Sequence, residues 1–314
     1  MNKLYLVIPC YNEEKVLPET VKRLNIKLNS MSASGLISSE SKILFVDDGS
    51  KDKTWNIIQN LTKEHSFIEA LKLSHNAGHQ NALLAGLMTV KDNCDCCISM
   101  DVDLQDDIEV LDEFVTKFNA GAQIVYGVRN KRENDSFFKK STAKGFYKLM
   151  KLFGTEIIND HADYRLMSST ALNALAQFNE VNLFLRGLTP LLGFKCDYVY
   201  YDRHERFAGE SKYPVKKMIS FAVDGITSFS VKPLKIISNL GIFISFASVL
   251  GLLYALISYF TGHAVSGWTA IVASIWLLGG IQMLCLGTVG TYIGKIYSEV
   301  KSRPRYIVEK HIIK

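Results

Sequence analysis

The sequence predicts an α/β fold with a mostly parallel sheet, followed by an interfacial helix and two transmembrane helices. Short apolar runs typical of buried strands alternate with amphipathic helical patterns up to residue 127. Polar and acidic residues follow several of these runs, at the strand ends where open parallel sheets bind ligands. Further along, the stretch 236–294 contains no Lys, Arg, Asp or Glu, which is typical of membrane-spanning segments.

The apolar runs predict five strands, at 4–8, 43–46, 68–73, 96–100 and 124–127. A helix that opens at Asn12-Glu13-Glu14 follows the first run, and further helical patterns stand around Trp55, at 79–90 and at 108–119. Strand–helix alternation of this kind implies a parallel sheet covered by helices on both faces. We therefore expect ligands to bind at the carboxyl ends of the strands.

Asp101 and Asp103 follow the fourth apolar run at a spacing of i and i+2, where a strand ends. Two such carboxylates can turn toward one point, and hard oxygens without a neighbouring His or thiolate favour Mg²⁺ or Mn²⁺. The alternative is that these residues, with Asp106 and Asp107, only solvate a loop and cap the helix that starts near Ile108. The residues alone leave both interpretations open.

The sequence contains neither the Gly-x-Gly-x-x-Gly pattern of dinucleotide-binding folds nor the Gly-x-x-x-x-Gly-Lys pattern of P-loops. A nucleoside diphosphate bound through a metal ion is the remaining economical interpretation of the acidic strand ends. The net charge is +5, and the basic residues are concentrated near the apolar stretch and the carboxyl terminus. This distribution favours anionic lipid and not nucleic acid as a partner. Six Cys without a paired framework suit a reducing compartment.

The charge-free stretch divides into 236–260 and 268–293, joined by a short external loop at 261–267. Each half is long enough to cross a bilayer, since a helical span needs about 20 apolar residues. The alternative is a very hydrophobic hairpin buried in a soluble protein. Basic residues flank both ends, which predicts that both termini are cytoplasmic: Lys212, Lys216, Lys217, Lys232 and Lys235 before the first span, and Lys295, Lys301, Arg303 and Arg305 after the second.

These features predict four regions: a cytoplasmic α/β domain at 1–213, an interfacial amphipathic helix at 214–235, two transmembrane helices within 236–294, and a cytoplasmic tail at 295–314. The amino terminus is too short in its apolar part to be a secretory signal. The interfacial helix would hold the domain near lipid headgroups, although it could instead pack under the domain. We therefore expect a multi-pass protein of the plasma membrane with its catalytic domain inside.

Six motifs in order carry a family resemblance. They are Ile8-Pro9-Cys10-Tyr11-Asn12-Glu13-Glu14, Val46-Asp47-Asp48-Gly49-Ser50, Asn76-Ala77-Gly78-His79, Asp101-Val102-Asp103-Leu104-Gln105-Asp106, Asp163-Tyr164-Arg165-Leu166 and Arg206-Phe207-Ala208-Gly209-Glu210-Ser211-Lys212-Tyr213. The first four resemble the family-two glycosyltransferases with the GT-A fold. The last two, followed by two spans, resemble the polyprenyl-phosphate glycosyltransferases of the bacterial two-span type, which are related to dolichol-phosphate mannose synthase. The resemblance covers essentially the whole chain.

The resemblance implies roles for particular residues. Asp163 takes the position usually assigned to catalysis, and Asp103 is the second residue expected to act in catalysis. Two residues depart from the family pattern: Asp107 stands in place of Pro and Tyr164 in place of Phe, and neither change removes a charged group. The nucleotide-sugar pocket would be lined by Pro9, Tyr11, Glu13, Asp48, Asp101 and Gln105, and the Mg²⁺ or Mn²⁺ ion would be held by Asp101, Asp103 and Gln105. The lipid phosphate would be gripped by Arg129, Arg165, Arg206, Ser211 and Lys212.

The resemblance also implies an activity, the inverting transfer of a sugar from a nucleotide-diphosphate donor to polyprenyl phosphate for cell-envelope glycosylation. We favour UDP-glucose and undecaprenyl phosphate, with UDP-N-acetylglucosamine or GDP-mannose as alternative donors. A processive polysaccharide synthase is a weaker alternative, because no Trp of the chain is preceded by Arg, as the Gln-x-x-Arg-Trp motif requires. A non-catalytic membrane anchor or transporter component is another, and the Gly-x-x-x-Gly at 290–294 suggests a homo-oligomer.

Overall fold

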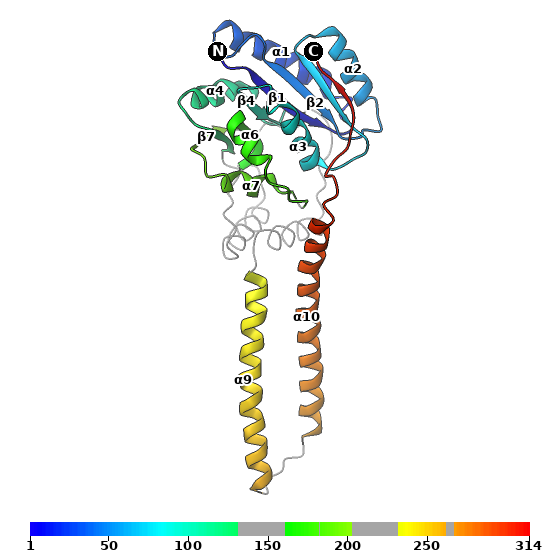
Figure 1. Cartoon of the computed structure of the whole chain (residues 1–314), viewed down its shortest axis with the longest axis vertical. Coiled ribbons are helices and arrows are strands. Elements are labelled where there is room, and N and C mark those ends of the chain that lie inside the picture. Colours follow the sequence, from blue (N-terminus) through cyan, green and yellow to red (C-terminus); the bar gives the residue numbers. More distant parts are fainter. Residues whose placement is uncertain (131–160, 182, 203–231, 262–266) are drawn as a thin grey trace. The chain divides into compact units, whose positions relative to one another are not determined.

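The computed structural model in Figure 1 describes residues 1–130, 161–181, 183–202, 232–261 and 267–314. These residues form two compact units. The first unit contains the amino-terminal part of the chain up to residue 202 together with Arg303–Lys314, and the second contains 232–302.

An eight-stranded sheet with the order β7-β5-β6-β4-β1-β2-β3-β8 forms the centre of the first unit. The pairs β1–β2, β1–β4, β2–β3 and β5–β7 are parallel. The α/β class with a mostly parallel sheet is therefore confirmed. All five predicted strands are present: β1 Leu4–Cys10, β2 Lys42–Asp47, β3 Ile68–Leu73, β4 Cys96–Ser99 and β5 Ile124–Arg129.

The helices predicted between these strands are α1 Leu17–Ala33, α2 Thr54–Glu64, α3 His79–Val90 and α4 Leu111–Asn119, the last preceded by the short 3-10 helix η1 Ile108–Val110. Every residue of β1 is buried, as a strand covered on both faces requires. On one face, Leu6 and Ile8 join a core with apolar residues of α1, α2 and α4. On the other face α3 packs so closely that a Cβ on Gly86 would lie 2.4 Å from Val7 Cγ1.

Four elements that the periodicity did not predict follow β5 among the described residues: β6 His161–Ser168, α6 Ser169–Leu175, α7 Leu185–Leu191 and β7 Cys196–Tyr201. β6 lies between β4 and β5 and runs antiparallel to both. Ser99 of β4 pairs with Arg165 of β6. This register brings the end of β4, where the acidic loop begins, next to the start of β6.

The carboxyl-terminal strand β8, Val308–Ile312, adds to the edge of the same sheet, antiparallel to β3. Lys72 Nζ lies 2.8 Å from Glu309 Oε2, and Arg305 Nη2 donates to the carbonyl of Phe178 at 2.9 Å. The sequence placed these residues in a cytoplasmic tail. In the structure they belong to the same sheet as the first strand of the chain.

The described residues of the second unit form two long helices, α9 Lys232–Phe260 and α10 Trp268–Val300 (Figure 1). Many of their large apolar side chains are exposed, among them Phe243, Phe246, Tyr254, Ile257, Leu277, Met283 and Leu286. Among the described residues, one segment, Leu277–Val300, has the length and hydropathy to cross a membrane. Most of the predicted interfacial helix, 214–231, lies outside the described residues.

Candidate active site

Asp163 of β6 is the centre of a polar cluster at the end of β4. Its side chain is 7 % exposed. Arg165 Nη2 lies 2.6 Å from Oδ1, and Arg186 of α7 is bidentate, with Nη2 2.9 Å from Oδ2 and Nε 3.2 Å from Oδ1. Gln80 of α3 donates through Nε2 to Oδ2 at 3.1 Å, and its Oε1 accepts from Leu185 N. The carboxylate thus joins the sheet to α3 and α7.

Burial by itself would raise the pKa of Asp163, but the surrounding cations outweigh it. Arg186, His79 and Arg165 together hold the pKa of this carboxyl well below its usual range. Asp163 is therefore ionised at neutral pH. A carboxylate held so firmly in its charged form is a poor proton acceptor.

His79, the first residue of α3, connects Asp163 to the acidic loop. Its Nε2 lies 3.6 Å from Asp163 Oδ2 and 3.6 Å from Asp101 Oδ1. Burial would lower the pKa of His79, but the two carboxylates raise it overall. The side chain of Asp101 is 38 % exposed. Desolvation, together with the nearby carboxylates of Asp106 and Asp163, raises the pKa of Asp101 to about 6. Because both lie 3.6 Å from the same nitrogen of His79, the carboxylates of Asp101 and Asp163 are close neighbours.

Within the acidic loop, the carboxylates take different roles. Asp103 Oδ1 accepts a hydrogen bond from Gln105 N at 3.2 Å, and Leu104 between them has a φ of 57°, a left-handed conformation that costs energy for a branched residue. Asp106 is buried and accepts from Tyr201 Oη at 2.6 Å and Arg129 Nη2 at 3.2 Å. Asp107 caps η1 by accepting from Glu109 N at 2.9 Å, as the capping interpretation requires of it.

The donor set of Asp101, Asp103 and Gln105 fits a hard divalent ion, because carboxylate and amide oxygens are the ligands that Mg²⁺ and Mn²⁺ accept. Burial is the largest cause of the raised pKa of Asp101, and the nearby carboxylates of Asp106 and Asp163, which raise it further, also favour a cation there. In the part of the chain that the structure describes, however, no group of three or more His, Cys, Asp or Glu is arranged to hold a metal. The oxygens are present at one strand end, but they do not form a ready-made cluster.

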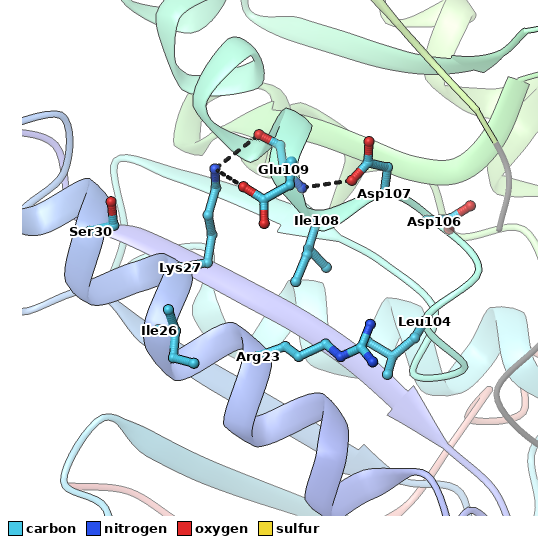
Figure 2. Close-up of a pocket in the computed structure, with 9 residues that line it drawn as sticks. All are labelled: Arg23, Ile26, Lys27, Ser30, Leu104, Asp106, Asp107, Ile108 and Glu109. Atoms are coloured by element: carbon cyan, nitrogen blue, oxygen red, sulfur yellow. Dashed lines mark hydrogen bonds and ion pairs between the residues drawn. The ribbon is translucent and has the colours of Figure 1, made fainter.

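Helix α1 braces the acidic loop from behind. The buried Thr20 donates through Oγ1 to the carbonyl of Val102, between Asp101 and Asp103, at 2.8 Å. The second brace is Lys27, whose Nζ donates to the carbonyl and carboxylate of Glu109, each at 3.0 Å (Figure 2).

A pocket of about 370 Å³ lies between α1 and the loop, and Figure 2 shows the residues that line it, including Arg23, Leu104, Asp107 and Ile108. Asp101, Asp103 and Asp163 do not line it. We therefore place the candidate active site at Asp101, Asp103 and Asp163, and this pocket lies on the side of the acidic loop that faces α1.

The residues expected around the nucleotide lie at the ends of β1 and β2. Tyr11 is 40 % exposed, and Glu13 N donates to Thr54 Oγ1 at 2.8 Å, which ties the loop after β1 to α2. Pro9 is buried and pairs with Val46 in the parallel register. Asp48 is buried, and its carboxylate accepts from the backbone N–H groups of Ala77 and Gly78 at 2.7 and 3.0 Å. It thereby fixes the turn that presents His79.

The cations expected to grip a lipid phosphate have different surroundings. Arg129 is 20 % exposed and paired with Asp106. Arg165 is 1 % exposed, and its Nη1 donates to Leu185 O and Thr189 Oγ1, so it joins β6 to α7 and has no open face. Arg206, Ser211 and Lys212 lie outside the described residues.

Sequence reasoning assigned no role to Gln80 or Arg186, and it treated His79 only as part of a motif. The structure brings all three onto Asp163. Gln80 and Arg186 are separated from Asp163 by 83 and 23 residues, and neither stands in a pattern that would mark it. The one sequence signal nearby is Gly78, because a glycine is favoured at the positive φ of 90° that the turn before His79 has in the structure.

The fold and this arrangement of carboxylates agree with a match in sequence: residues 5–175 match the family described as Glycosyl transferase family 2. The chain belongs to this family and is a glycosyltransferase. A protein of Bacillus subtilis (strain 168) described as the uncharacterized glycosyltransferase YkoT is 50% identical over 98% of this chain and 91% of that protein. The prophage bactoprenol glucosyl transferase homolog of Escherichia coli (strain K12) is 39% identical over 98% of this chain and 99% of its own length.

Among solved structures, the mannosyltransferase PcManGT from Pyrobaculum calidifontis, in complex with GDP-Man and Mn²⁺, aligns with 95% of this chain and 87% of that chain. The identity is 13% and the TM-score is 0.44.

Proposed function

We propose that this glycosyltransferase moves glucose from UDP-glucose to undecaprenyl phosphate and so forms a lipid-monophosphate sugar. The proposal rests on the meeting of Asp101 and Asp163 around His79, in a chain that is similar over nearly its whole length to proteins named bactoprenol glucosyl transferase. These relatives are 38–39% identical to the chain. UDP-N-acetylglucosamine and GDP-mannose remain the alternative donors, because donor choice depends on a few hydroxyl or acetamido contacts.

The donor is proposed to bind across the ends of β1, β2 and β4. Pro9, Tyr11, Glu13 and Asp48 would form the nucleotide side. Asp101, Asp103 and Gln105 would hold Mg²⁺ or Mn²⁺, which when bound neutralises charge on the departing diphosphate. The residues of the loop are braced by α1 before any ligand arrives, which lowers the cost of ordering them.

The chemistry is proposed to be a single displacement in which a phosphate oxygen of the lipid attacks the anomeric carbon. A phosphate monoester has its second pKa near ~6, so at neutral pH the acceptor is already mostly a dianion. It needs no strong base. Asp163, whose pKa is held well below its usual range, is better suited to orient cations around the acceptor than to remove a proton.

We place the second unit in the plasma membrane with both termini in the cytoplasm. The exposed apolar side chains of α9 and α10 support this, and so does the connectivity. β1 and β8 belong to one sheet, so the chain enters and leaves 215–302 from the same compact unit. A membrane segment with that connectivity crosses an even number of times, and α9 and α10 would supply two crossings.

Topology can be tested by labelling single cysteines in a background without native Cys. Ser266→Cys should react with an impermeant reagent on intact cells, and Ser302→Cys should react only after lysis. Labelling of Ser302→Cys from outside would invert the topology and remove cytosolic nucleotide sugar from the proposal.

The activity is tested with purified protein in detergent, undecaprenyl phosphate, and a panel of radiolabelled nucleotide sugars with either divalent metal or EDTA. We expect a single labelled lipid product from UDP-glucose that requires metal. A polymeric product would indicate a processive synthase. Transfer from none of the donors would favour a non-catalytic role.

A further inference from the structure

Arg186 differs from Arg165, the other guanidinium on Asp163, in that its side chain reaches solvent. It is 38 % exposed, whereas Arg165 is 1 % exposed. Its two contacts with Asp163 use Nε and Nη2. Among the described residues, the remaining nitrogen, Nη1, makes no hydrogen bond or ion pair, so one edge of the guanidinium is not used by the carboxylate.

Asp163 does not need Arg186 for charge balance. Arg165 already lies 2.6 Å from Asp163 Oδ1 in a buried pair, which by itself compensates one negative charge. The second guanidinium leaves Asp163, Arg165 and Arg186 with a net positive charge. The nearby Asp101 offsets part of this charge, and the exposed edge of Arg186 remains a cationic group that an anionic ligand can contact.

We propose that Arg186 binds the phosphate monoester of the acceptor lipid through its outer edge while its inner edge stays on Asp163. Asp163 is then the positioning residue that holds Arg186. This inference rests on the proposed function and adds a binding residue to it. Arg suits the task because its planar fork can serve a carboxylate on one side and phosphate oxygens on the other.

The acceptor phosphate, and not the donor diphosphate, is the anion that this geometry favours. The diphosphate is assigned to the acidic loop, where Asp101 faces Asp163 through His79. Arg186 approaches Asp163 from α7, a different element.

The test compares Arg186→Gln, Arg186→Lys and the control Arg23→Gln, an arginine bonded to the single carboxylate of Glu19 on the surface of α1. We expect Arg186→Gln to raise KM for undecaprenyl phosphate at least tenfold, with KM for UDP-glucose changed less than twofold. Arg186→Lys should lie between it and wild type, because the charge is kept. A purely structural role would lower kcat and thermal stability without separating the two KM values.

A binding arm makes the result independent of turnover. Farnesyl phosphate, titrated calorimetrically into each protein in detergent, should bind wild type and Arg23→Gln alike and Arg186→Gln at least tenfold more weakly. UDP binding reports whether each variant is folded. If Arg186→Gln is not folded, the comparison is made with Arg186→Lys. Equal farnesyl phosphate binding by all folded variants, or a shift in KM for UDP-glucose alone, overturns the inference. If wild type binds farnesyl phosphate through Arg186 but transfers no sugar to lipid, the proposed function fails and the inference stands.

Discussion

Arg165 Nη2 and Asp163 Oδ1 are 2.6 Å apart in a buried ion pair within one strand. The two residues are i and i+2 in β6, so their side chains leave the same face of the sheet. Because Arg165 also donates to Leu185 O and Thr189 Oγ1, the pair fixes α7 against β6. Asp163, which we propose for the catalytic position, is thus also a structural centre of the first unit.

We predict that Asp163→Asn lowers stability at pH 7 by about 3–5 kcal/mol, because removing one partner of a buried pair leaves an uncompensated charge. The measurement is the shift of the thermal or denaturant unfolding transition in detergent. Asp92→Asn is the control, since Asp92 pairs with Lys91 but is 67 % exposed, and we expect it to change stability by less than about 1 kcal/mol.

The pH dependence of that difference has a definite sign. The folded-state pKa of Asp163 is depressed, so its contribution is fully present above the unfolded value of about 3.9 and is lost as the pH falls through the folded pKa. The part of the difference between wild type and Asp163→Asn that comes from Asp163 itself should shrink only in strong acid. Asp163 also raises the pKa of His79, so the variant loses that contribution and the difference should become smaller as the pH rises from 6 to 8. In a His79→Asn background the difference should be constant from pH 6 to 8, and a change there would show that Asp163 titrates in this range, as a general base would.

We predict that Asp103→Asn reduces transfer at least about 100-fold, whereas Asp107→Asn costs little. Weakening a metal ligand removes charge stabilisation worth several kcal/mol from the leaving diphosphate. Asp107 serves as a helix cap, a role that Asn fills equally well. Initial rates across a Mg²⁺ and Mn²⁺ titration measure both variants. Full activity in EDTA would contradict the metal assignment.

We predict that the brace between α1 and the acidic loop affects metal use. Thr20→Val keeps the shape but leaves the buried Val102 carbonyl without its donor, a loss of about 1–3 kcal/mol. We expect a raised metal requirement and about tenfold lower activity, with recovery in Thr20→Ser. Thr62→Val is a matched control, because Thr62 is also a buried helical Thr but bonds only within its own helix. Equal metal curves for the two Val variants would remove the brace from the mechanism.

We predict that ending the chain after Ser302 destabilises the first unit. The deletion uncovers the edge of β3 and removes Ile312, which packs against the core. An unpaired edge strand also promotes association between molecules. Thermal unfolding and size-exclusion chromatography should show a lower transition and aggregation. Glu309→Gln, which breaks only the ion pair with Lys72, is the mild control, and an unchanged transition in the truncated protein would mean that β8 adds nothing.

Local periodicity was sufficient to predict β1 to β5 and the helices between them, because each carries its own apolar pattern. It could not predict β6, which runs antiparallel between β4 and β5 through pairings made by residues distant in sequence. Local periodicity did not predict β8 either. Its Glu309, Lys310 and His311 look like a solvated tail, and an edge strand tolerates them because its residues remain mostly exposed.

The candidate site shows the same division. Asp101, Asp103 and Asp163 stand in recognisable motifs, so the sequence alone was sufficient to name them as candidates. The contacts of Asp163 with Gln80 and Arg186 arise only when α3 and α7 pack beside β6. Arg165 and Arg186 are both arginines near Asp163, and only burial separates the one that supports the fold from the one that faces solvent.

The last prediction concerns the mechanism. If the lipid phosphate attacks in one step as a dianion, the product has inverted anomeric configuration, and Asp163→Asn retains a measurable rate at a temperature where it is folded. That residual rate should rise with pH through the acceptor's ionisation near ~6, because the nucleophile and not Asp163 supplies the titrating group. Anomeric analysis of the product and a pH profile of the variant provide the measurement. An α-linked product from an α-linked donor, or a sugar ester trapped on Asp163, would indicate a double displacement. In that case Asp163 would itself be the nucleophile, and Arg165 and Arg186 would hold it in position. That role fits the structure poorly, because hydrogen bonds from two guanidiniums lower the reactivity of a carboxylate.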